Sequence, residues 1–275
     1  MARDFLLWRH LRVLRARTMR HIRRLVTSPQ GQAQARAEPT AYGVRMIPNW
    51  NDRTYAYCRY GTYGPYLADL ILAVEQPFLF LDIGANQGLF SLIASRNPFC
   101  KAIVALEPVP KTHTRLLRNF AANGLGDRAQ ALAFGLSGRT GTHQIACRRS
   151  HSGVATLEGH LSQREPHAIS VAVEMRTVAG LAPHLPADLP IFVKIDVEGH
   201  EAQVITQLLT SHLAGRIMAL FYEHDNKWSD GEAIAALLAN SGFAINRQYG
   251  RGRHYDVFAL PPCPRRKFAE QMTGQ

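Results

Sequence analysis

The segment Phe78-Leu-Phe-Leu-Asp-Ile-Gly-Ala-Asn-Gln-Gly88 reads as a strand, a glycine turn and the start of a helix. Its apolar run, residues 78–81, has the length of a strand that is buried on both faces. The apolar residues that follow Gly88 are spaced as on one face of a helix. Open α/β sheets build nucleotide sites from such a unit, because glycine lets the backbone approach a ligand and a helix start supplies unpaired N–H groups.

The glycine turn does not match the common phosphate-binding motifs. Gly84 fits the first glycine of a dinucleotide fingerprint, but Asn86 and Leu89 stand at the second and third glycine positions. No Gly-Lys-Ser/Thr follows, which excludes a P-loop. Asp82, at the end of the strand, would repel a pyrophosphate and attract an ammonium group. We therefore predict a cofactor with a cationic, amino-acid-like end, such as S-adenosylmethionine (SAM).

Two further strands are predicted to end in acids. Residues 101–106 lead to Glu107, which can accept hydrogen bonds from the two hydroxyls of a ribose. Residues 191–195 lead to Asp196. The carboxyl ends of parallel strands share one edge of a sheet, where ligands bind in open α/β folds. The sequence therefore predicts that Asp82, Glu107 and Asp196 surround one crevice.

The order of predicted elements indicates a Rossmann-like, doubly wound α/β fold with a mostly parallel sheet of seven strands. After a strand at 129–134, we expect the loop that contains Ser137 to lie near the adenine end of the cofactor. Runs at 140–150 and 169–176 extend the sheet or form a flap, and residues 150–166 between them have the composition of a mobile loop. The remaining strands are predicted at 216–222, 243–248 and 255–260, the last two as an antiparallel pair.

The composition indicates a globular chain. Of its 275 residues, 46% are hydrophobic, enough to bury a sizeable core. The apolar runs are far shorter than the roughly 18 residues of a membrane-spanning helix. The four cysteines are scattered and form no Cys-x-x-Cys pair, so we expect reduced thiols in a cytoplasmic protein.

The positive charge is concentrated at the N-terminus. The net charge is +11, and residues 1–28 contribute +7 of it through eight arginines and one acid, Asp4. We divide the chain into a basic arm and linker at 1–40, a catalytic domain at 41–262 and a tail at 263–275. Because the body carries little of the charge, we expect no nucleic acid as partner of the domain.

The arm has the pattern of a basic amphipathic helix, and several roles fit it. It can extend into solvent, pack on the body or a second subunit, or lie on the anionic inner face of a membrane as a peripheral contact. The alternative for the whole chain is a module that binds nucleic acid or a membrane surface without catalysis. The oligomeric state does not follow from the sequence.

The segment between the arm and Phe78 is predicted to hold a hairpin and a helix. Residues 42–60 contain two strand-like runs, and Gly64-Pro65 begins a helix that extends to about residue 76. Tyrosines gather here, at positions 55, 57, 60, 63 and 66. We interpret them as packing of an additional layer, with the wall of a substrate pocket as the alternative.

The acidic strand ends occur within longer motifs that resemble the FkbM-type family of SAM-dependent methyltransferases. These motifs are Asp82-Ile-Gly-Ala-Asn-x-Gly-x-Phe-Ser91, Glu107-Pro108 and Lys194-Ile-Asp-Val-Glu-Gly-x-Glu201. They occur in the family's order and spacing, and the resemblance covers about residues 60–260. The resemblance implies O-methylation of a hydroxyl, on a sugar, a glycolipid or polysaccharide, or a secondary metabolite. The cofactor-binding residues that we predict are Asp82, Gly84, Asn86, Gly88, Glu107, Ser137 and Asp196.

O-methylation also requires removal of a proton from the hydroxyl, and a base within hydrogen-bond reach is the usual means. Asp196, His200, Glu223 and His224 are the candidates, and we favour Asp196 and His224 as the catalytic residues. A divalent metal ion held by Asp196 and a neighbouring acid would instead lower the pKa of the hydroxyl. We do not favour this alternative, and we predict no metal ligands.

Overall fold

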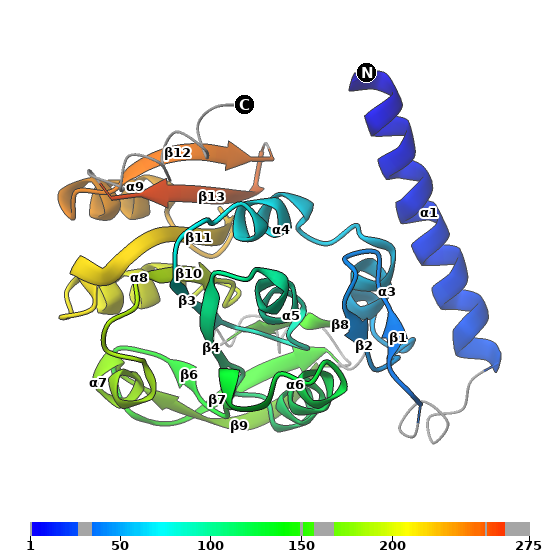
Figure 1. Ribbon diagram of the computed structural model, residues 1–275, viewed down its shortest axis with the longest axis horizontal. Helices are drawn as coiled ribbons and strands as arrows, with labels where there is room; N and C mark the ends of the chain where they lie inside the picture. The colour runs from blue at the N-terminus through cyan, green and yellow to red at the C-terminus, as the bar shows by residue number, and fades with distance from the viewer. Residues whose placement is uncertain (1, 27–34, 149–150, 157–167, 251, 262–275) are drawn as a thin grey trace.

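The computed structural model describes residues 2–26, 35–148, 151–156, 168–250 and 252–261 (Figure 1). Its centre is a sheet of seven strands in the order β12-β13-β11-β10-β3-β4-β5. These strands are β3 (Phe78–Ile83), β4 (Cys100–Leu106), β5 (Ala129–Leu132), β10 (Ile191–Ile195), β11 (Ile217–Asp225), β12 (Ala244–Tyr249) and β13 (His254–Leu260). Neighbours from β5 to β11 run parallel, and β13 is antiparallel to both strands beside it. The predicted mostly parallel, doubly wound sheet is confirmed.

Helices cover both faces of the central sheet, which explains why all six residues of β3 are buried. One face packs on α4 (Pro65–Leu72), α5 (Leu89–Arg96) and α6 (Pro110–Ala122). The other face packs on α7 (Val178–Leu181), α8 (Glu201–Leu209) and α9 (Gly231–Asn240). Alternate residues of β3 enter the two cores: Phe78 and Phe80 face α5, whereas Leu79, Leu81 and Ile83 face α8.

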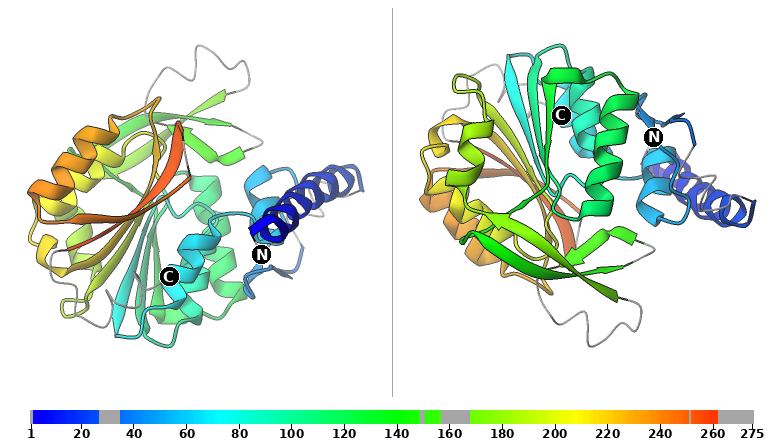
Figure 2. Two further views of the ribbon diagram at one scale, coloured as in Figure 1. Left: turned by 90° about the horizontal axis from the view of Figure 1, so that it is seen from above. Right: turned by 90° about the horizontal axis from the view of Figure 1, so that it is seen from below.

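The chain between β5 and β10 forms a second sheet rather than an extension of the first. Its strands are β6 (Gly135–Leu136), β7 (Gly141–Arg148), β8 (His151–Thr156) and β9 (Ala168–Arg176), in the order β6-β9-β7-β8. Figure 2 shows this sheet as a separate layer beside the central one. The loop predicted at 150–166 includes β8, and its residues 157–167 lie outside the described part of the chain.

The hairpin predicted between the two strand-like runs of residues 42–60 is wrong. β1 (Glu38–Pro39) pairs with β2 (Arg45–Met46), but the next run is the helix α3 (Arg53–Tyr60). Asp52 caps this helix, because its Oδ1 accepts a hydrogen bond from the Thr54 N–H at 2.9 Å. Tyr55 and Cys58 are buried three residues apart on one side of α3, which is the period of a helix and not of a strand.

The arm is the helix α1 (Ala2–Val26), which lies along α3 on the outside of the molecule (Figures 1 and 2). Ala16 is fully buried at this contact, and Arg20 donates a hydrogen bond to the carbonyl of Asn51 at 3.1 Å. Arg23 lies over the ring of Trp50. In the described part of the chain, no helix has both the length and the apolar character needed to cross a membrane.

The predicted domain boundaries stay predictions. The boundary between residues 40 and 41 falls within the pairing of β1 with β2. Most of the linker and the whole tail at 263–275 lie outside the described residues.

Gly88 permits the close packing of α5 on α6. It precedes α5 with φ +87°, and a Cβ there would lie 2.4 Å from Leu116 Cδ1. We expect Gly88→Ala to lower the free energy of unfolding by about 2–4 kcal/mol, because it adds a clash to a left-handed backbone. Urea unfolding measures this change.

Two other glycines distinguish the effect of the clash from the effect of the left-handed backbone. At Gly124, with φ +65°, a Cβ would meet no atom within 4 Å, so Gly124→Ala should report the backbone strain alone, about 1–2 kcal/mol. At exposed Gly215, which has no positive φ and no near neighbour, we expect little change. Equal losses at Gly88 and Gly124 would contradict the packing role.

Candidate active site

A cavity lies at the carboxyl ends of β3, β4 and β10, where the glycine turn meets the second sheet. It has a volume of about 70 Å³. It is lined by Gly84, Asn86, Glu107, Asp196 and Glu198 at the edge of the central sheet. Ile145 and Met175 of the second sheet also line it. We call this space the first cavity.

Gly84 brings two strand ends into backbone contact. It has φ +75°, and a Cβ at this position would lie 1.9 Å from the carbonyl oxygen of Asp196. Any side chain would therefore push the turn after β3 away from the turn after β10. Asn86 follows with φ +50°, so the backbone of this turn is left-handed at two places and lies close against the first cavity.

Glu107 faces the first cavity in a fixed orientation. Its Oε2 accepts a hydrogen bond from the Asn86 N–H and its Oε1 accepts one from the Val109 N–H, both at 2.9 Å. The residue is 6% exposed. Burial raises the pKa of Glu107 to about 7, although the two backbone N–H groups act in the opposite direction. Each oxygen retains a lone pair, so the carboxylate can still accept two hydroxyl donors.

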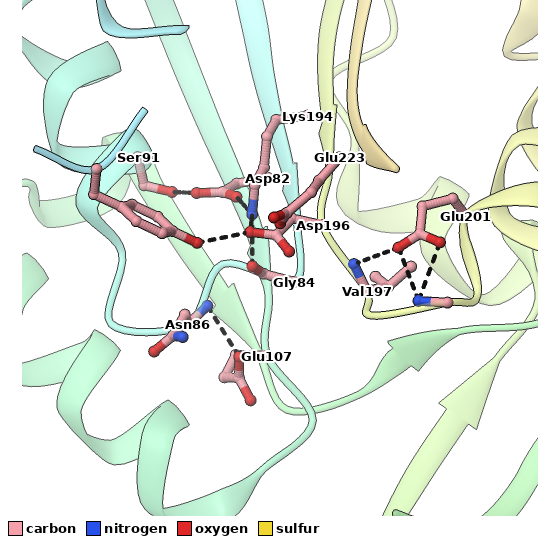
Figure 3. A network of polar contacts seen from close by, with 12 residues as sticks. Asp82, Gly84, Asn86, Ser91, Glu107, Lys194, Asp196, Val197, Glu201 and Glu223 are labelled. Atoms are coloured by element: carbon pink, nitrogen blue, oxygen red, sulfur yellow. Dashed lines mark hydrogen bonds and ion pairs between the residues drawn. The ribbon is translucent and has the colours of Figure 1, made fainter. Parts of the chain in front are cut away.

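Asp82 does not face the first cavity, which corrects the prediction that it attracts the ammonium group of a ligand. It is fully buried. Its Oδ2 accepts a hydrogen bond from Ser91 Oγ at 2.7 Å, and its Oδ1 lies 3.2 Å from Lys194 Nζ (Figure 3). The positive partner of Asp82 is therefore a lysine of the same chain.

Lys194 connects the acids at the strand ends, and the sequence reasoning did not assign it a role. Its Nζ lies 3.2 Å from Asp82 and 3.6 Å from Asp196, and it donates a hydrogen bond to the Gly84 carbonyl at 2.6 Å. Burial lowers the pKa of Lys194, but Asp82 and Asp196 outweigh burial and keep that pKa above its usual value. A lysine inside the apolar run 191–195 was the available signal, since a buried cation requires a partner.

Asp196 borders the first cavity and also a second one. The second cavity has a volume of about 290 Å³ and lies between β10, β11, β13 and the segment that begins α4. Tyr63 Oη donates a hydrogen bond to Asp196 Oδ2 at 3.0 Å. Burial raises the pKa of Asp196, but Lys194, followed by hydrogen bonds to Glu223 and Tyr63, brings it below its usual value. One ionised carboxylate thus lies between the two cavities.

Aromatic and acidic side chains form the walls of the second cavity. Tyr66 and Tyr249 stack with centroids 4.5 Å apart, and both line the cavity with Phe90. Glu223 and Asp256 supply further carboxyl groups. Of the clustered tyrosines, Tyr63 and Tyr66 contribute to this pocket, whereas Tyr55 and Tyr60 pack against Trp50.

The loop after β10 is held by its own acid. The Glu201 carboxylate accepts hydrogen bonds from the N–H groups of Val197 and Gly199, at 3.3 and 3.1 Å. Glu198, between them, has φ +51° and lines the first cavity. Glu201 therefore fixes the loop, and Glu198 is an acid that the sequence reasoning did not place in the site.

Besides Asp82, two further residues of the predicted cofactor set do not line the first cavity. Ser137 Oγ donates to Gln203 Oε1 at 3.0 Å, while its neighbours Gly135 and Leu136 line the cavity. Gly88 serves the packing of α5 on α6. The first cavity therefore brings together Gly84, Asn86, Glu107 and Asp196 from the predicted set.

The structure does not bring His224 to the site. It is fully buried, with Nε2 2.7 Å from Asn226 Oδ1 and Nδ1 3.1 Å from Ser229 Oγ. Because side chains alternate along β11, Glu223 faces the second cavity and His224 faces the opposite side. The prediction that His224 lies in the site is therefore wrong, and the residue of β11 that lines the second cavity beside Asp196 is Glu223.

This arrangement of sheet, glycine turn and acids defines a methyltransferase of the Rossmann-like class. Residues 82–245 match the model of the methyltransferase FkbM domain. The chain therefore belongs to the FkbM family of methyltransferases, with SAM as the cofactor. Within the described ranges, no group of three or more His, Cys, Asp or Glu side chains has the arrangement of a metal site.

The chain is also similar, at low sequence identity, to individual proteins. The methyltransferase sdnD of Sordaria araneosa is 29% identical over 206 residues, which cover 65% of this chain and 78% of that protein. Ribosomal protein L11 methylase of Lactobacillus delbrueckii subsp. bulgaricus has a TM-score of 0.44 at 15% identity, covering 73% of this chain and 79% of its own. Sp1610 of Streptococcus pneumoniae, solved in complex with S-adenosyl-L-methionine, has a TM-score of 0.45 at 15% identity, covering 72% and 70%.

We expect Lys194→Met to lower the free energy of unfolding by about 3–5 kcal/mol, because it leaves two carboxylates buried without their cation. The double variant Lys194→Met/Asp82→Asn removes one of these charges together with the lysine. Its loss of unfolding free energy should be smaller than the sum of the losses of Lys194→Met and Asp82→Asn. Urea unfolding of the three variants provides this comparison, and additive losses would argue against the ion pair.

Proposed function

We propose that this protein transfers a methyl group from SAM to a hydroxyl oxygen of an acceptor in the second cavity. The observation that carries the proposal is the position of Asp196, which borders both cavities. A donor in the first cavity and an acceptor in the second would meet at this carboxylate. Methyl transfer is an in-line displacement, so catalysis consists largely of holding the two partners in this geometry.

The residues of the first cavity fit SAM. Gly84 lets the backbone lie close to a ligand, and the Glu107 carboxylate is oriented to accept the two ribose hydroxyls. When bound, SAM supplies a methyl group on a positively charged sulfur. Asp196, whose pKa is held below its usual value, is the acid of the cavity beside which such a charge is favourable.

The residues of the second cavity fit an acceptor that carries hydroxyl groups. Asp196, oriented by Tyr63 and kept ionised by Lys194, would accept the proton of the hydroxyl. The stacked Tyr66 and Tyr249 offer apolar faces, on which the C–H face of a sugar ring or the ring of a secondary metabolite can pack. Sugars, glycolipids or polysaccharides, and secondary metabolites are therefore the proposed acceptor classes.

Methyl-labelled SAM tests the reaction directly. The purified protein is incubated with trideuteromethyl SAM and a metabolite and glycolipid extract of the source cell. We expect products that carry the labelled methyl group on oxygen, and we expect Asp196→Asn not to form them. Label on nitrogen or carbon would overturn the O-methyl assignment, and absence of label with the parent protein would overturn the acceptor classes.

Glu107→Gln should weaken SAM binding by about tenfold to a hundredfold, because it removes charge-assisted hydrogen bonds to the ribose. Calorimetry measures the dissociation constant. Glu174→Gln is the matched control, since the Glu174 side chain is 49% exposed and pairs with Arg176 away from the first cavity. Equal affinities of Glu107→Gln and the control would contradict the proposed cofactor position.

We also propose that α1 lies on an anionic membrane surface. Its described outer side exposes Leu11, Leu14 and Ile22, at 48, 62 and 45%. Arg12 and Arg17 are exposed at the edges of the contact with the body, where Arg12 approaches Gly61 and Arg17 lines a groove with Tyr57 of α3. An apolar stripe with arginines beside it suits the boundary between lipid head groups and acyl chains. The opposite side of the helix is occupied by the contact with α3, so the stripe is turned outward.

Replacing all three outward residues, Leu11→Gln, Leu14→Gln and Ile22→Gln, should reduce flotation with anionic vesicles by about tenfold or more. The control is Leu72→Gln, Leu117→Gln and Ile245→Gln, which changes apolar side chains of similar exposure, at 42, 47 and 45%, outside α1. We expect this control to float like the parent. Equal flotation of the two triple variants would refute the membrane role.

A further inference from the structure

Asp196 and Glu223 are neighbours: both line the second cavity, and they directly follow the paired residues Ile195 of β10 and Tyr222 of β11. Their carboxyl groups lie side by side in Figure 3. Two adjacent carboxylates repel each other, so such a pair is most stable when one member carries a proton. We therefore expect the pair to hold one proton and its two members to titrate together.

The surroundings of the pair place this proton on Glu223. Lys194 and Tyr63 both contact Asp196 and stabilise its ionised form. Burial, followed by the neighbouring Asp196, raises the pKa of Glu223 well above its usual value. Glu223 is therefore the member that carries the proton, and Asp196 is the ionised member.

Other charged groups face the pair from three sides. Glu198 approaches from the loop after β10, and burial together with Asp196 and Glu223 raises its pKa to about 9. Asp256 of β13 lies opposite Glu223, and burial and Asp196 raise its pKa to about 6. His254 Nε2 lies 2.5 Å from Glu223 Oε1. Beyond Lys194 lies Asp82, so carboxyl groups outnumber the cations around the pair.

This excess of acid gives the pair a use in the proposed methyl transfer. We propose that the Asp196–Glu223 pair holds its shared proton in the free protein and releases it when the cationic methyl donor enters the first cavity. The positive sulfur then takes the place of the proton as the compensating charge. The pair can exchange protons with solvent, because the Glu223 side chain is 24% exposed and its neighbour His254 is 57% exposed.

The proposal rests on the proposed function and accounts for every charge in the reaction. As the hydroxyl oxygen bonds to the methyl carbon, the carbon–sulfur bond breaks and its electron pair stays on sulfur, which becomes neutral. The hydroxyl proton passes to the Asp196–Glu223 pair, which regains the proton it had released. The site therefore loses one positive charge and gains another in the same step.

The number of protons released on ligand binding tests the proposal without a known acceptor. Calorimetric titrations in buffers of different ionisation enthalpy give this number. SAM is compared with S-adenosylhomocysteine, which carries no charge on its sulfur. At about pH 6 the amino groups of both ligands are protonated. SAM should release more protons than S-adenosylhomocysteine, by a difference that approaches about one per site.

Variants identify the group that loses the proton. Glu223→Gln should abolish the difference between the two ligands, whereas Glu198→Gln should retain it. Glu107 also has a raised pKa and lines the first cavity, but any proton that it loses is common to both ligands and cancels. Exposed Glu232, on α9, gives the matched control Glu232→Gln, which should behave like the parent.

The outcomes separate the two proposals. If neither ligand binds, the proposed cofactor site is wrong. If both bind and release equal numbers of protons, only the proton exchange is overturned, and this comparison needs no variant that must fold. Loss of the difference in Glu198→Gln but not in Glu223→Gln would also overturn the assignment to the pair.

Discussion

The buried ammonium group of Lys194 holds the strand ends of this site together. It lies between Asp82 of β3 and Asp196 after β10, and it also binds the Gly84 carbonyl. Removing a lysine and two carboxylates from water costs several kcal/mol per ion, so such a group persists only where its geometry satisfies it. Here the cation compensates two acids and a carbonyl at the edge of the sheet where ligands bind.

The two cavities beside this ion pair are formed by different parts of the chain. The first cavity is formed by backbone turns, with Gly84 and Asn86 in left-handed conformations and Glu107 fixed by two N–H groups. The second cavity is formed by side chains, among them Tyr66 and Tyr249. A cavity built from backbone suits a constant cofactor, whereas one built from side chains can vary with the acceptor. Membership of the FkbM family fixes the methyl transfer, and in the proposed function the second cavity sets the acceptor.

Sequence patterns were sufficient where a local rule determines the outcome. Apolar runs of strand length followed by Gly84 or by Glu107 predicted the parallel sheet and the acids at its edge. They were insufficient where the result depends on pairing between strands. Asp82 and Lys194 are cross-strand neighbours only in the observed register of β3 with β10, so the cation opposite Asp82 was assigned to a ligand. Likewise, the alternation of side chains along β11 determines that Glu223, and not His224, faces the second cavity.

In the proposed function, the shared border between the cavities couples the affinities for their two occupants. Asp196 contributes to both spaces, so a molecule that alters its ionisation in one cavity changes the field in the other. By thermodynamic reciprocity, heterotropic coupling between the two occupants has the same magnitude in both directions. S-adenosylhomocysteine carries no charge on its sulfur, so it no longer stabilises the ionised Asp196. Its dissociation before a new cycle is therefore favoured.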